Sequence, residues 1–328
     1  MSPPQVTVII PALDAEATLG SALDSAASGD VEVLVVDDGS HDRTAELVRD
    51  RRDRRIRLLT TPQRRSGVGV ARNMALDSAR GEWVALLDAD DTWDAGRLTS
   101  LLDAAHAERA DVVADDLHIT RDGRIVDSLL TQRGLDVGAG ETLTLESYVR
   151  NDLGLLKPVI RRDLLERHGI RYTEQRRATT DFAFGFECIR AARRTYLVGQ
   201  AMYTYVKQTG ERTVSSSSPQ FWLDAHEVTT ELLASAEGEA IRSLLRQRGR
   251  RAMSRYHYVS AKQDAAQGRP LRALQRTVRH PGMVTIGAEA VRRRLQQRSA
   301  LDALDRGTVP PGRRAEQDGD RSVDRRER

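Results

Sequence analysis

The chain has 328 residues, and 51 Lys and Arg against 48 Asp and Glu give it a formal net charge of +3. This near-neutral balance argues against a dedicated nucleic-acid-binding protein, and the mean hydropathy of −0.50 is typical of a globular chain. No stretch approaches the ~20 apolar residues of a membrane span, and the first residues lack the pattern of a signal peptide. The single cysteine, Cys188, cannot form an internal disulfide, which favours a reducing compartment. We therefore expect a cytoplasmic protein.

Five short apolar runs stand in the N-terminal part of the chain. Their starts recur about every 25 to 28 residues, which is the period of βα units in a parallel sheet. Near-continuous apolar strands suit a sheet that is covered on both faces. The predicted strands are 6–10, 31–36, 56–59, 83–87 and 111–114.

The segments between these runs have helical patterning, and Ser40 is placed to cap the second helix with Asp42 beside its positive N-terminal end. The predicted helices are about 15–28, 42–52, 69–79 and 95–109. Further along we expect a hairpin turn at 121–124, helices at 162–167 and 181–192, and a short strand near 195–198.

A run of serines before Pro219 changes the composition and indicates a boundary. We therefore expect a single α/β Rossmann-like domain with a mostly parallel mixed sheet over 1–215. It would be followed by a basic helical C-terminal region over 216–306. Residues 307–328 have almost no apolar side chains and are predicted to be a disordered tail.

Three carboxylates, Asp88, Asp90 and Asp91, come directly after the fourth apolar run. The carboxyl end of a strand in a parallel α/β sheet is where ligands bind. Carboxylates packed there repel one another unless a cation or a hydrogen-bond donor resolves the repulsion. Mg²⁺ or Mn²⁺, which keeps waters and bridges substrate phosphates, would suit such a cluster. The alternative is a solvated acidic turn that caps the next helix.

A second acidic turn, Asp37-Asp38-Gly39-Ser40, follows the second apolar run. Its carboxylates are suited to accept hydrogen bonds from a base or from ribose hydroxyls, although Asp and Gly also favour ordinary turns. The Gly67–Asn73 segment lacks both the third glycine of a dinucleotide fingerprint and the lysine of a Walker A loop. Its Arg72, early in a helix that faces the sheet edge, is still placed to meet a diphosphate.

Together these pieces resemble the family 2 glycosyltransferases with the GT-A fold. Four motifs occur in the family's order and spacing: Pro11-Ala12, the Asp37-Asp38 turn, Ala71-Arg72-Asn73, and Asp88-Ala89-Asp90. The likeness is strong over about residues 5–115 and looser over 150–215. Three segments resemble bacterial exopolysaccharide enzymes of the succinoglycan glucosyltransferase kind, namely 113–117, 153–158 and 161–172.

This resemblance implies a role for each matching residue. Asp38, with Asp37, would contact the uracil or ribose of a nucleotide-sugar, and Pro11 and Ala12 would line the nucleoside pocket. Arg72 would lie near the nucleotide. The ribose, diphosphate and metal would be served by Asp88 and Asp90, with Asp90 the direct ligand of Mg²⁺ or Mn²⁺.

The resemblance also points to Asp181 as the catalytic base. The family has a Glu-Asp pair at the start of a helix, and here Thr180 replaces the glutamate. Asp181 could instead be only a helix N-cap, for which Asp is a preferred residue. Glu187, further along the same helix, is the fallback carboxylate. Lys207 or Arg212 could close over the diphosphate, although a plain surface loop explains them as well.

The resemblance implies inverting transfer of a sugar from a nucleotide-sugar, expected to be a UDP-hexose. The sugar would go to a hydroxyl of a glycan or polyprenyl-linked acceptor. The product would enter bacterial exopolysaccharide or cell-surface glycan. One alternative is a sugar-nucleotide nucleotidyltransferase, which would need a basic glycine-rich loop where this chain has an acidic Pro11–Glu16 segment. Another alternative is a non-catalytic module that binds a nucleotide-sugar. The presence of Thr180 in place of the family's glutamate is compatible with this alternative.

The charge is unevenly distributed, because 241–300 carries 15 Lys and Arg but only Asp264 and Glu289. Within it, one helical stripe is apolar and another is basic, after Pro270 at a helix start. A basic amphipathic helix predicts peripheral contact with an anionic membrane; the alternative is a solvated face packed on the acidic catalytic domain. The apolar stripe is Leu271, Leu274 and Val278, and the basic stripe is Arg272, Arg276 and Arg279.

Overall fold

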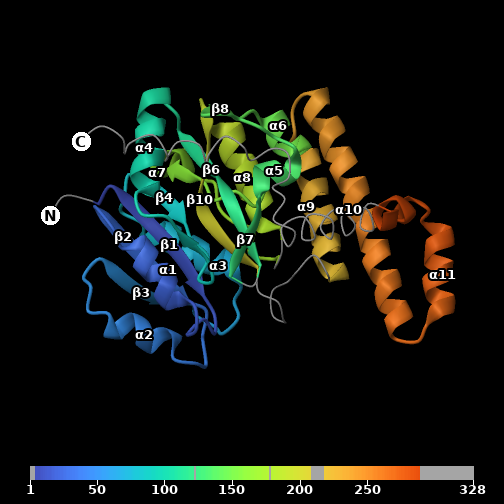
Figure 1. The fold of residues 1–328 in the computed structure, drawn as a ribbon, viewed down its shortest axis with the longest axis horizontal. Coiled ribbons are helices and arrows are strands. Elements are labelled where there is room, and N and C mark those ends of the chain that lie inside the picture. The colour runs from blue at the N-terminus through green and yellow to red at the C-terminus, as the bar shows by residue number, and fades with distance from the viewer. Residues whose placement is uncertain (1–3, 122, 177–178, 208–217, 289–328) are drawn as a thin grey trace, which may run out of the picture. The chain divides into compact units, whose positions relative to one another are not determined.

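A computed structural model describes residues 4–121, 123–176, 179–207 and 218–288 (Figure 1). By its contacts the chain divides into two compact units, Met1–Met253 and Ser254–Arg328. The predicted boundary at residue 215 and the predicted tail at 307–328 both lie outside the described residues. None of the helices in the described ranges is long and apolar enough to cross a membrane.

In the residues that the structure describes, the first unit is built on a mixed sheet of ten strands. In chain order they are β1 (Val6–Ala12), β2 (Val31–Asp37), β3 (Ile56–Thr60), β4 (Trp83–Leu86), β5 (Thr92–Trp93), β6 (Val112–Arg121), β7 (Arg124–Ser128), β8 (Gly140–Thr142), β9 (Val159–Arg161) and β10 (Thr195–Lys207). Strands β3, β2, β1 and β4 are parallel neighbours, and β6 and β10 form a second parallel pair. Strand β9 lies between β4 and β6 and is antiparallel to both. The strand order is β3-β2-β1-β4-β9-β6-β10-β5, with β7 paired to β6 and β8 to β10.

All five predicted strands are confirmed, and the hairpin is confirmed by pairing of Arg121 with Arg124, while Asp122 between them lies outside the described residues. The strand expected at 195–198 is longer, because it continues through an irregularity to Lys207.

The predicted helices are confirmed, each within a few residues of its expected ends. The helices are α1 (Leu19–Ala26), α2 (Thr44–Asp50), α3 (Val68–Ser78), α4 (Arg97–Glu108), α5 (Leu129–Arg133), α6 (Leu145–Arg150), α7 (Arg162–Arg167), α8 (Thr180–Ala191), α9 (Pro219–Ser235), α10 (Glu239–Ala266) and α11 (Pro270–Arg279).

The cap predicted for α2 is wrong. The hydroxyl of Ser40 donates to Asp37 and accepts from the backbone N–H of Asp14, so it ties two loops together instead. The carboxylate of Asp42 accepts from the N–H of Thr44 at 3.0 Å and so serves the first turn of α2. Because the Ser40 hydroxyl is engaged by Asp37 and Asp14, Asp42 supplies the acceptor for the N–H of Thr44.

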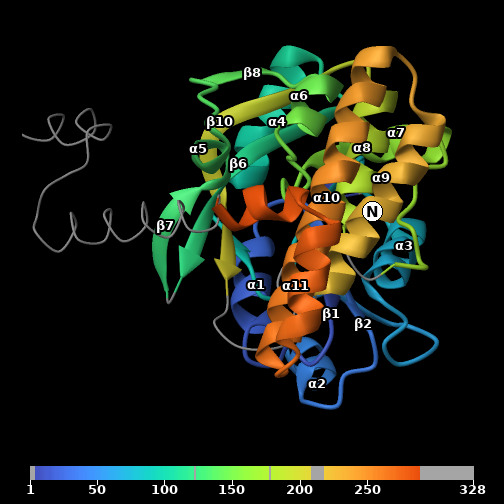
Figure 2. The ribbon, with the colours of Figure 1, turned by 90° about the vertical axis from the view of Figure 1, so that its right-hand side faces the viewer.

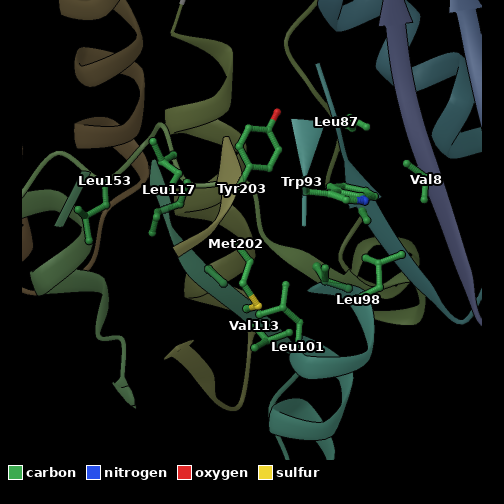
Figure 3. Packing of buried hydrophobic residues seen from close by; sticks show 14 of the residues in the cluster. Val8, Leu87, Trp93, Leu98, Leu101, Val113, Leu117, Leu153, Met202 and Tyr203 are labelled. Atoms are coloured by element: carbon green, nitrogen blue, oxygen red, sulfur yellow. The ribbon is translucent and has the colours of Figure 1, made fainter. Parts of the chain in front are cut away.

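The sheet is covered on both faces, as its apolar strands predict. Along β1, Val8 and Ile10 point into one core cluster, which packs against α1 and α4. Ile9 points to the other side, into a cluster formed with α3 and α7. Figure 3 shows part of the first cluster, where Trp93 lies beside the strands and Leu101 comes from α4. The two layers leave the carboxyl ends of β1, β2 and β4 as a common edge.

Candidate active site

The acidic residues that follow two parallel strands lie at that edge. Strands β2 and β4 each pair with β1 in parallel, so Asp37 at the end of β2 and Asp88 just past β4 come to the same side of the sheet. This is the side at which α/β sheets bind ligands. The sequence-based placement of the two acidic turns is therefore confirmed at the level of the fold.

Four charged side chains form one network at this edge. Arg72 of α3 donates through Nη2 to Oδ1 of Asp88 at 2.7 Å and through Nη1 to Oδ1 of Asp181. The Nζ of Lys157 lies 2.8 Å from Oδ2 of Asp88 and 2.8 Å from Oδ2 of Asp181. Each cation thus bridges the same two carboxylates.

The network is polarised between interior and surface. The side chains of Arg72 and Lys157 are 3% and 2% exposed, whereas those of Asp88 and Asp181 are 26% and 25% exposed. The cations lie beneath the carboxylates, and water or a ligand reaches the carboxylates first. Two positive and two negative charges make the network neutral as a whole.

Burial and ion pairing oppose each other in this network, and ion pairing prevails. Burial alone would raise the pKa of Asp88, but Lys157 and Arg72 hold that pKa well below its usual range. The pKa of Asp181 is lowered in the same way, since Arg72 and Lys157 outweigh its burial. The two carboxylates likewise raise the pKa of Lys157 despite its burial. All four groups are therefore charged at neutral pH.

Contacts between α3 and the segment before α8 hold Arg72 at the sheet edge. Its guanidinium lies 4.9 Å from the centre of the Tyr172 ring. Asn73 donates to the carbonyl of Tyr172 at 3.0 Å and accepts from its N–H at 2.8 Å, which holds the segment before α8 against α3. A Cβ on Gly69 would meet the carbonyl oxygen of Thr173 at 2.3 Å, so only glycine permits this close approach.

Lys157 is held from behind by a second buried ion pair. Arg97 donates to Asp115 at 2.7 Å and to the carbonyl of Lys157 at 2.6 Å. Lys157 is not among the site residues predicted from the sequence. Lysine occurs only at 157, 207 and 262 in a chain otherwise dominated by arginine, and that rarity was the available signal.

Asp181 is not the N-cap of α8. The N-cap position is Thr179, whose side chain makes no capping bond, and the Asp181 carboxylate is directed to Arg72 and Lys157 instead. The helix-cap interpretation is therefore wrong. Glu187, the fallback carboxylate, pairs with Arg190 on its own helix and takes no part in the network.

Asp91 clamps the acidic loop to β10. Its Oδ2 accepts from the hydroxyl of Tyr203 at 2.7 Å and its Oδ1 from the N–H of Val206 at 2.8 Å. Tyr203 in turn accepts from the N–H of Asp88 at 3.2 Å. Burial, reinforced by Asp88 and Asp90, raises the pKa of Asp91 to about 8. Asp91 therefore positions its neighbours.

Asp90 differs from Asp88, which pairs with Arg72 and Lys157, because no basic side chain of the described residues lies within ion-pair distance of Asp90. Burial and the charge of Asp88 raise its pKa. The described residues contain no cluster of three or more His, Cys, Asp or Glu side chains that could hold a metal ion by themselves. A Mg²⁺ site usually needs only one or two carboxylates plus substrate phosphates. Asp90 forms no ion pair among the described residues and interacts electrostatically with Asp88, so these two carboxylates fit such an ion.

The second acidic turn organises the adjoining loop. Both oxygens of Asp38 accept hydrogen bonds, from the Thr61 hydroxyl at 2.8 Å and from the N–H groups of Ser66 at 2.8 Å and Gly67 at 2.9 Å. The N–H of Asp38 donates to the carbonyl of Ala12 at 2.8 Å. Asp38 thus connects the end of β1 to the loop that leads into α3.

The predicted nucleoside residues are brought together by strand register. Pro11 pairs with Val36 and Ala12 with Asp37 across β1 and β2. Asp37 is buried and accepts from the N–H of Ser40 at 3.0 Å. The structure therefore gathers Pro11, Ala12, Asp37 and Asp38 into one group, and Arg72, Asp88 and Asp181 into another. Lys207 and Arg212 cannot be placed, because the side chain of the first and all of the second lie outside the described residues.

The comparison with known families decides what kind of protein has this arrangement. The family model described as glycosyl transferase family 2 matches residues 7–197, which contain every residue of both groups. The chain belongs to glycosyl transferase family 2. The resemblance drawn from the four motifs is thereby confirmed.

Curated relatives of this family 2 chain include bacterial polysaccharide proteins. The succinoglycan biosynthesis protein ExoO of Rhizobium meliloti is 32% identical over 214 residues, which cover 62% of this chain and 60% of that protein. An Escherichia coli protein, WfgD, named UDP-Glc:alpha-D-GlcNAc-diphosphoundecaprenol beta-1,3-glucosyltransferase, is 30% identical over 49% of this chain and 61% of its own length. The chain thus spans about three fifths of the relatives that it matches.

Solved structures show the same fold. Residues 1–349 of Staphylococcus aureus TarS, in complex with UDP-GlcNAc, match with a TM-score of 0.60 at 23% identity, over 82% of this chain and 79% of that one. The mannosyltransferase PcManGT from Pyrobaculum calidifontis, in complex with GDP-Man and Mn²⁺, matches with a TM-score of 0.55 at 19% identity, over 89% and 81%. These likenesses confirm the predicted GT-A-like α/β fold.

Proposed function

We propose that this family 2 chain is a metal-dependent inverting glycosyltransferase that moves a sugar from a nucleotide-sugar, a UDP-hexose, to an acceptor hydroxyl. The acceptor would be a glycan or a polyprenyl-linked oligosaccharide of bacterial exopolysaccharide or cell-surface glycan synthesis. The names of the relatives support this substrate class. The observation that carries the proposal is the network through which Arg72 and Lys157 join Asp88 to Asp181.

Asp181 would be the general base. Inverting transfer needs a carboxylate within hydrogen-bond reach of the attacking hydroxyl, which contributes roughly 10²–10⁴-fold in rate. Both oxygens of Asp181 pair with cations, one with Arg72 and the other with Lys157. One must be released before it can accept the proton of the acceptor.

The donor itself would bring about that release. A diphosphate is an anion that competes with Asp181 and Asp88 for the two bridging cations. Lys157 is the more mobile partner, because an ammonium on a flexible stem adapts to a new ligand more readily than a stacked guanidinium such as Arg72. In this scheme donor binding frees the base, so hydroxyl activation follows the arrival of the sugar donor.

The remaining residues would bind the donor. Asp38 with Asp37 would contact the uracil or ribose, and Pro11 and Ala12 would line the nucleoside pocket. This assignment is supported by their common position at the carboxyl ends of β1 and β2. Arg72 would then meet the diphosphate from beneath.

Asp90, with Asp88, would hold Mg²⁺ or Mn²⁺ together with the donor phosphates. Such an ion acts as a Lewis acid that stabilises the negative charge on the departing nucleoside diphosphate. Burial and the charge of Asp88 raise the pKa of Asp90, and a bound cation would offset both effects, which supports this assignment. Removal of divalent ions with a chelator should therefore abolish UDP release, and added Mn²⁺ or Mg²⁺ should restore it.

The decisive test combines a donor panel with the Asp181→Asn variant. The purified chain is incubated with UDP-sugars, Mn²⁺ and candidate acceptors, and UDP release and glycosylated product are measured. The variant should lose about 10²–10⁴-fold in turnover and still bind UDP. Glu187→Gln, on the same helix but outside the network, should keep its activity.

The proposed function fails if no donor yields UDP or product. When pyrophosphate is added, conversion of the UDP-sugar to UTP and a sugar 1-phosphate would instead indicate a nucleotidyltransferase. Binding of the donor without turnover would indicate a non-catalytic module. If the wild type transfers sugar and Asp181→Asn does so equally well, the reaction stands and the assignment of the base is wrong.

A further inference from the structure

Helix α11 carries an apolar row that no described residue of its own unit, up to residue 288, buries. Leu271, Leu274 and Val278 are 75%, 61% and 73% exposed, and no residue of α11 is buried. Positions three and seven residues apart in a helix lie on one side of it. The three side chains therefore form a continuous strip on the surface, which we call the α11 apolar row.

The opposite side of α11 is the side that packs. Ala273, Arg276 and Thr277 are partly covered, and Arg276 reaches back to Asp264 near the end of α10 at 3.2 Å. Figure 2 shows α11 returning alongside the last turns of α10. A helix that stabilises a fold turns its apolar side to the core. Here the polar side contacts the protein and the apolar side faces solvent.

The hairpin of α10 and α11 is held together without the apolar row. The imidazole rings of His257 and His280 stack at 3.4 Å between centroids. Met283, just past α11, is buried, and a Cβ on Gly282 would lie 3.1 Å from the hydroxyl of Ser254. Because these contacts and the Arg276–Asp264 pair secure the hairpin, the exposed row is not needed for folding.

The surface around the apolar row is positively charged. Asp264 is the sole acidic residue in the sequence from 254 to 288, and it is the partner of Arg276. Arg272 and Arg279 of α11 are both exposed, on the flank between the apolar row and the packed side. An exposed apolar strip flanked by arginine is the pattern of a helix that lies in a lipid interface.

We propose that the α11 apolar row, with Arg272 and Arg279, docks this chain on the surface of an anionic phospholipid membrane. The row would enter the boundary between headgroups and acyl chains. The arginines would meet lipid phosphates, and each would raise the affinity for an anionic leaflet by roughly fivefold. A second copy of the chain fits less well, because it would bring two positive surfaces together. This surface lies outside the proposed catalytic site, so its test does not depend on glycosyl transfer.

The test measures sedimentation of the full chain with vesicles. Vesicles of phosphatidylcholine alone are compared with vesicles that contain phosphatidylglycerol as well, at low and at high salt. We expect binding to the anionic vesicles at low salt, weakened by high salt, and little binding to phosphatidylcholine.

Two variants separate the apolar and the charged contributions. Leu271→Ser/Leu274→Ser/Val278→Ser and Arg272→Gln/Arg279→Gln should each reduce the partition coefficient by about tenfold or more. The control Ile125→Ser/Val126→Ser removes exposed apolar side chains from β7 and should bind like the wild type. Circular dichroism and UDP binding should be unchanged in all three.

Two results would overturn the proposal. One is equal sedimentation of the wild type and of both α11 variants. The other is a dimer in light scattering that the triple serine variant converts to a monomer without any change in vesicle binding, since the row would then join two copies of the chain.

Discussion

Two buried sets of ion pairs lie next to each other in this molecule, and they differ in how far solvent reaches them. Arg97 and Asp115 are 0% and 1% exposed. In the neighbouring network, the cations Arg72 and Lys157 are equally buried, but a quarter of each carboxylate is open to solvent. The two sets touch at the carbonyl of Lys157, to which Arg97 donates.

This difference in exposure indicates that the open network can bind a ligand, whereas the closed pair can only stabilise the fold. A closed pair such as Arg97–Asp115 cannot exchange partners, because no ligand reaches it. The open network has the same chemistry with an accessible side, so an anion or a cation from solvent can replace one of its contacts. Strongly perturbed groups at an open edge are the usual signature of a functional site.

The largest stability change should come from breaking the closed pair. Arg97→Met leaves Asp115 buried without its partner, which typically costs about 3–5 kcal/mol. It also removes the contact of Arg97 with the Trp93 ring, at 4.9 Å. Urea denaturation measures the loss in the free energy of unfolding.

The double variant Arg97→Met/Asp115→Leu provides the control. It removes the stranded charge and should recover much of the lost stability. If the single variant unfolded at the same urea concentration as the wild type, the closed pair would have no supporting role.

Lys157→Met should have a different effect, on ligand binding more than on stability. Loss of a charged contact should weaken UDP binding by about tenfold, or about 1.4 kcal/mol, while uridine binding stays nearly constant. Stability should fall less than in Arg97→Met, because water can solvate the partly exposed carboxylates of Asp88 and Asp181. Isothermal titration calorimetry with UDP and with uridine measures both affinities, and the ratio of the two is compared between the wild type and the variant.

Lys262→Met, a change at an exposed lysine on α10, is the matched control and should leave both affinities unchanged. An equal loss of UDP and uridine binding in Lys157→Met would contradict a diphosphate contact and indicate a general disturbance of the site.

The smallest effect concerns another buried carboxylate, Glu32, and the pH dependence of stability that it causes. Burial would raise its pKa, but hydrogen bonds from Thr7 and Arg80 lower it below the usual value. A carboxylate with a lowered folded-state pKa contributes stability above its unfolded pKa of about 4.3, and this is lost as the pH falls through the folded value.

Between about pH 6 and 3, the melting temperature of the wild type should therefore fall more steeply than that of Glu32→Gln. The difference should be modest, because Arg80 is largely exposed. Parallel curves for the two proteins would show that Glu32 is not held in its charged form by folding.

Much of the site could be predicted from sequence, because a residue that follows an apolar strand can be assigned to one edge of a parallel sheet. Asp37 and Asp88 each follow an apolar run, and parallel strands bring such ends to one edge. Arg72 and Asp181 were identified by the motifs around them rather than by periodicity. The role of Lys157 was missed, because nothing next to it in sequence is catalytic and its partners come from two other segments.

Predictions of helix caps from local sequence failed where a side chain finds a partner elsewhere in the fold. Ser40 has the right chemistry for a helix cap, yet it bonds Asp37 and Asp14 while Asp42 serves α2. Asp181 has the right chemistry for an N-cap, yet two buried cations draw its carboxylate away. In both cases a tertiary partner outweighed a local preference.

The family, the α/β pattern and most of the charged residues at the sheet edge follow from the amino-acid sequence alone, because apolar periodicity and short motifs are local properties of the chain. The amphipathic pattern of α11 is local as well. The folded structure was needed to show that Arg72 and Asp181, 109 positions apart, share one network with Lys157, and that α11 packs through its polar side. Those outcomes depend on which groups are buried against one another, and burial sets both the strength of an ion pair and the side of a helix that is left for a partner.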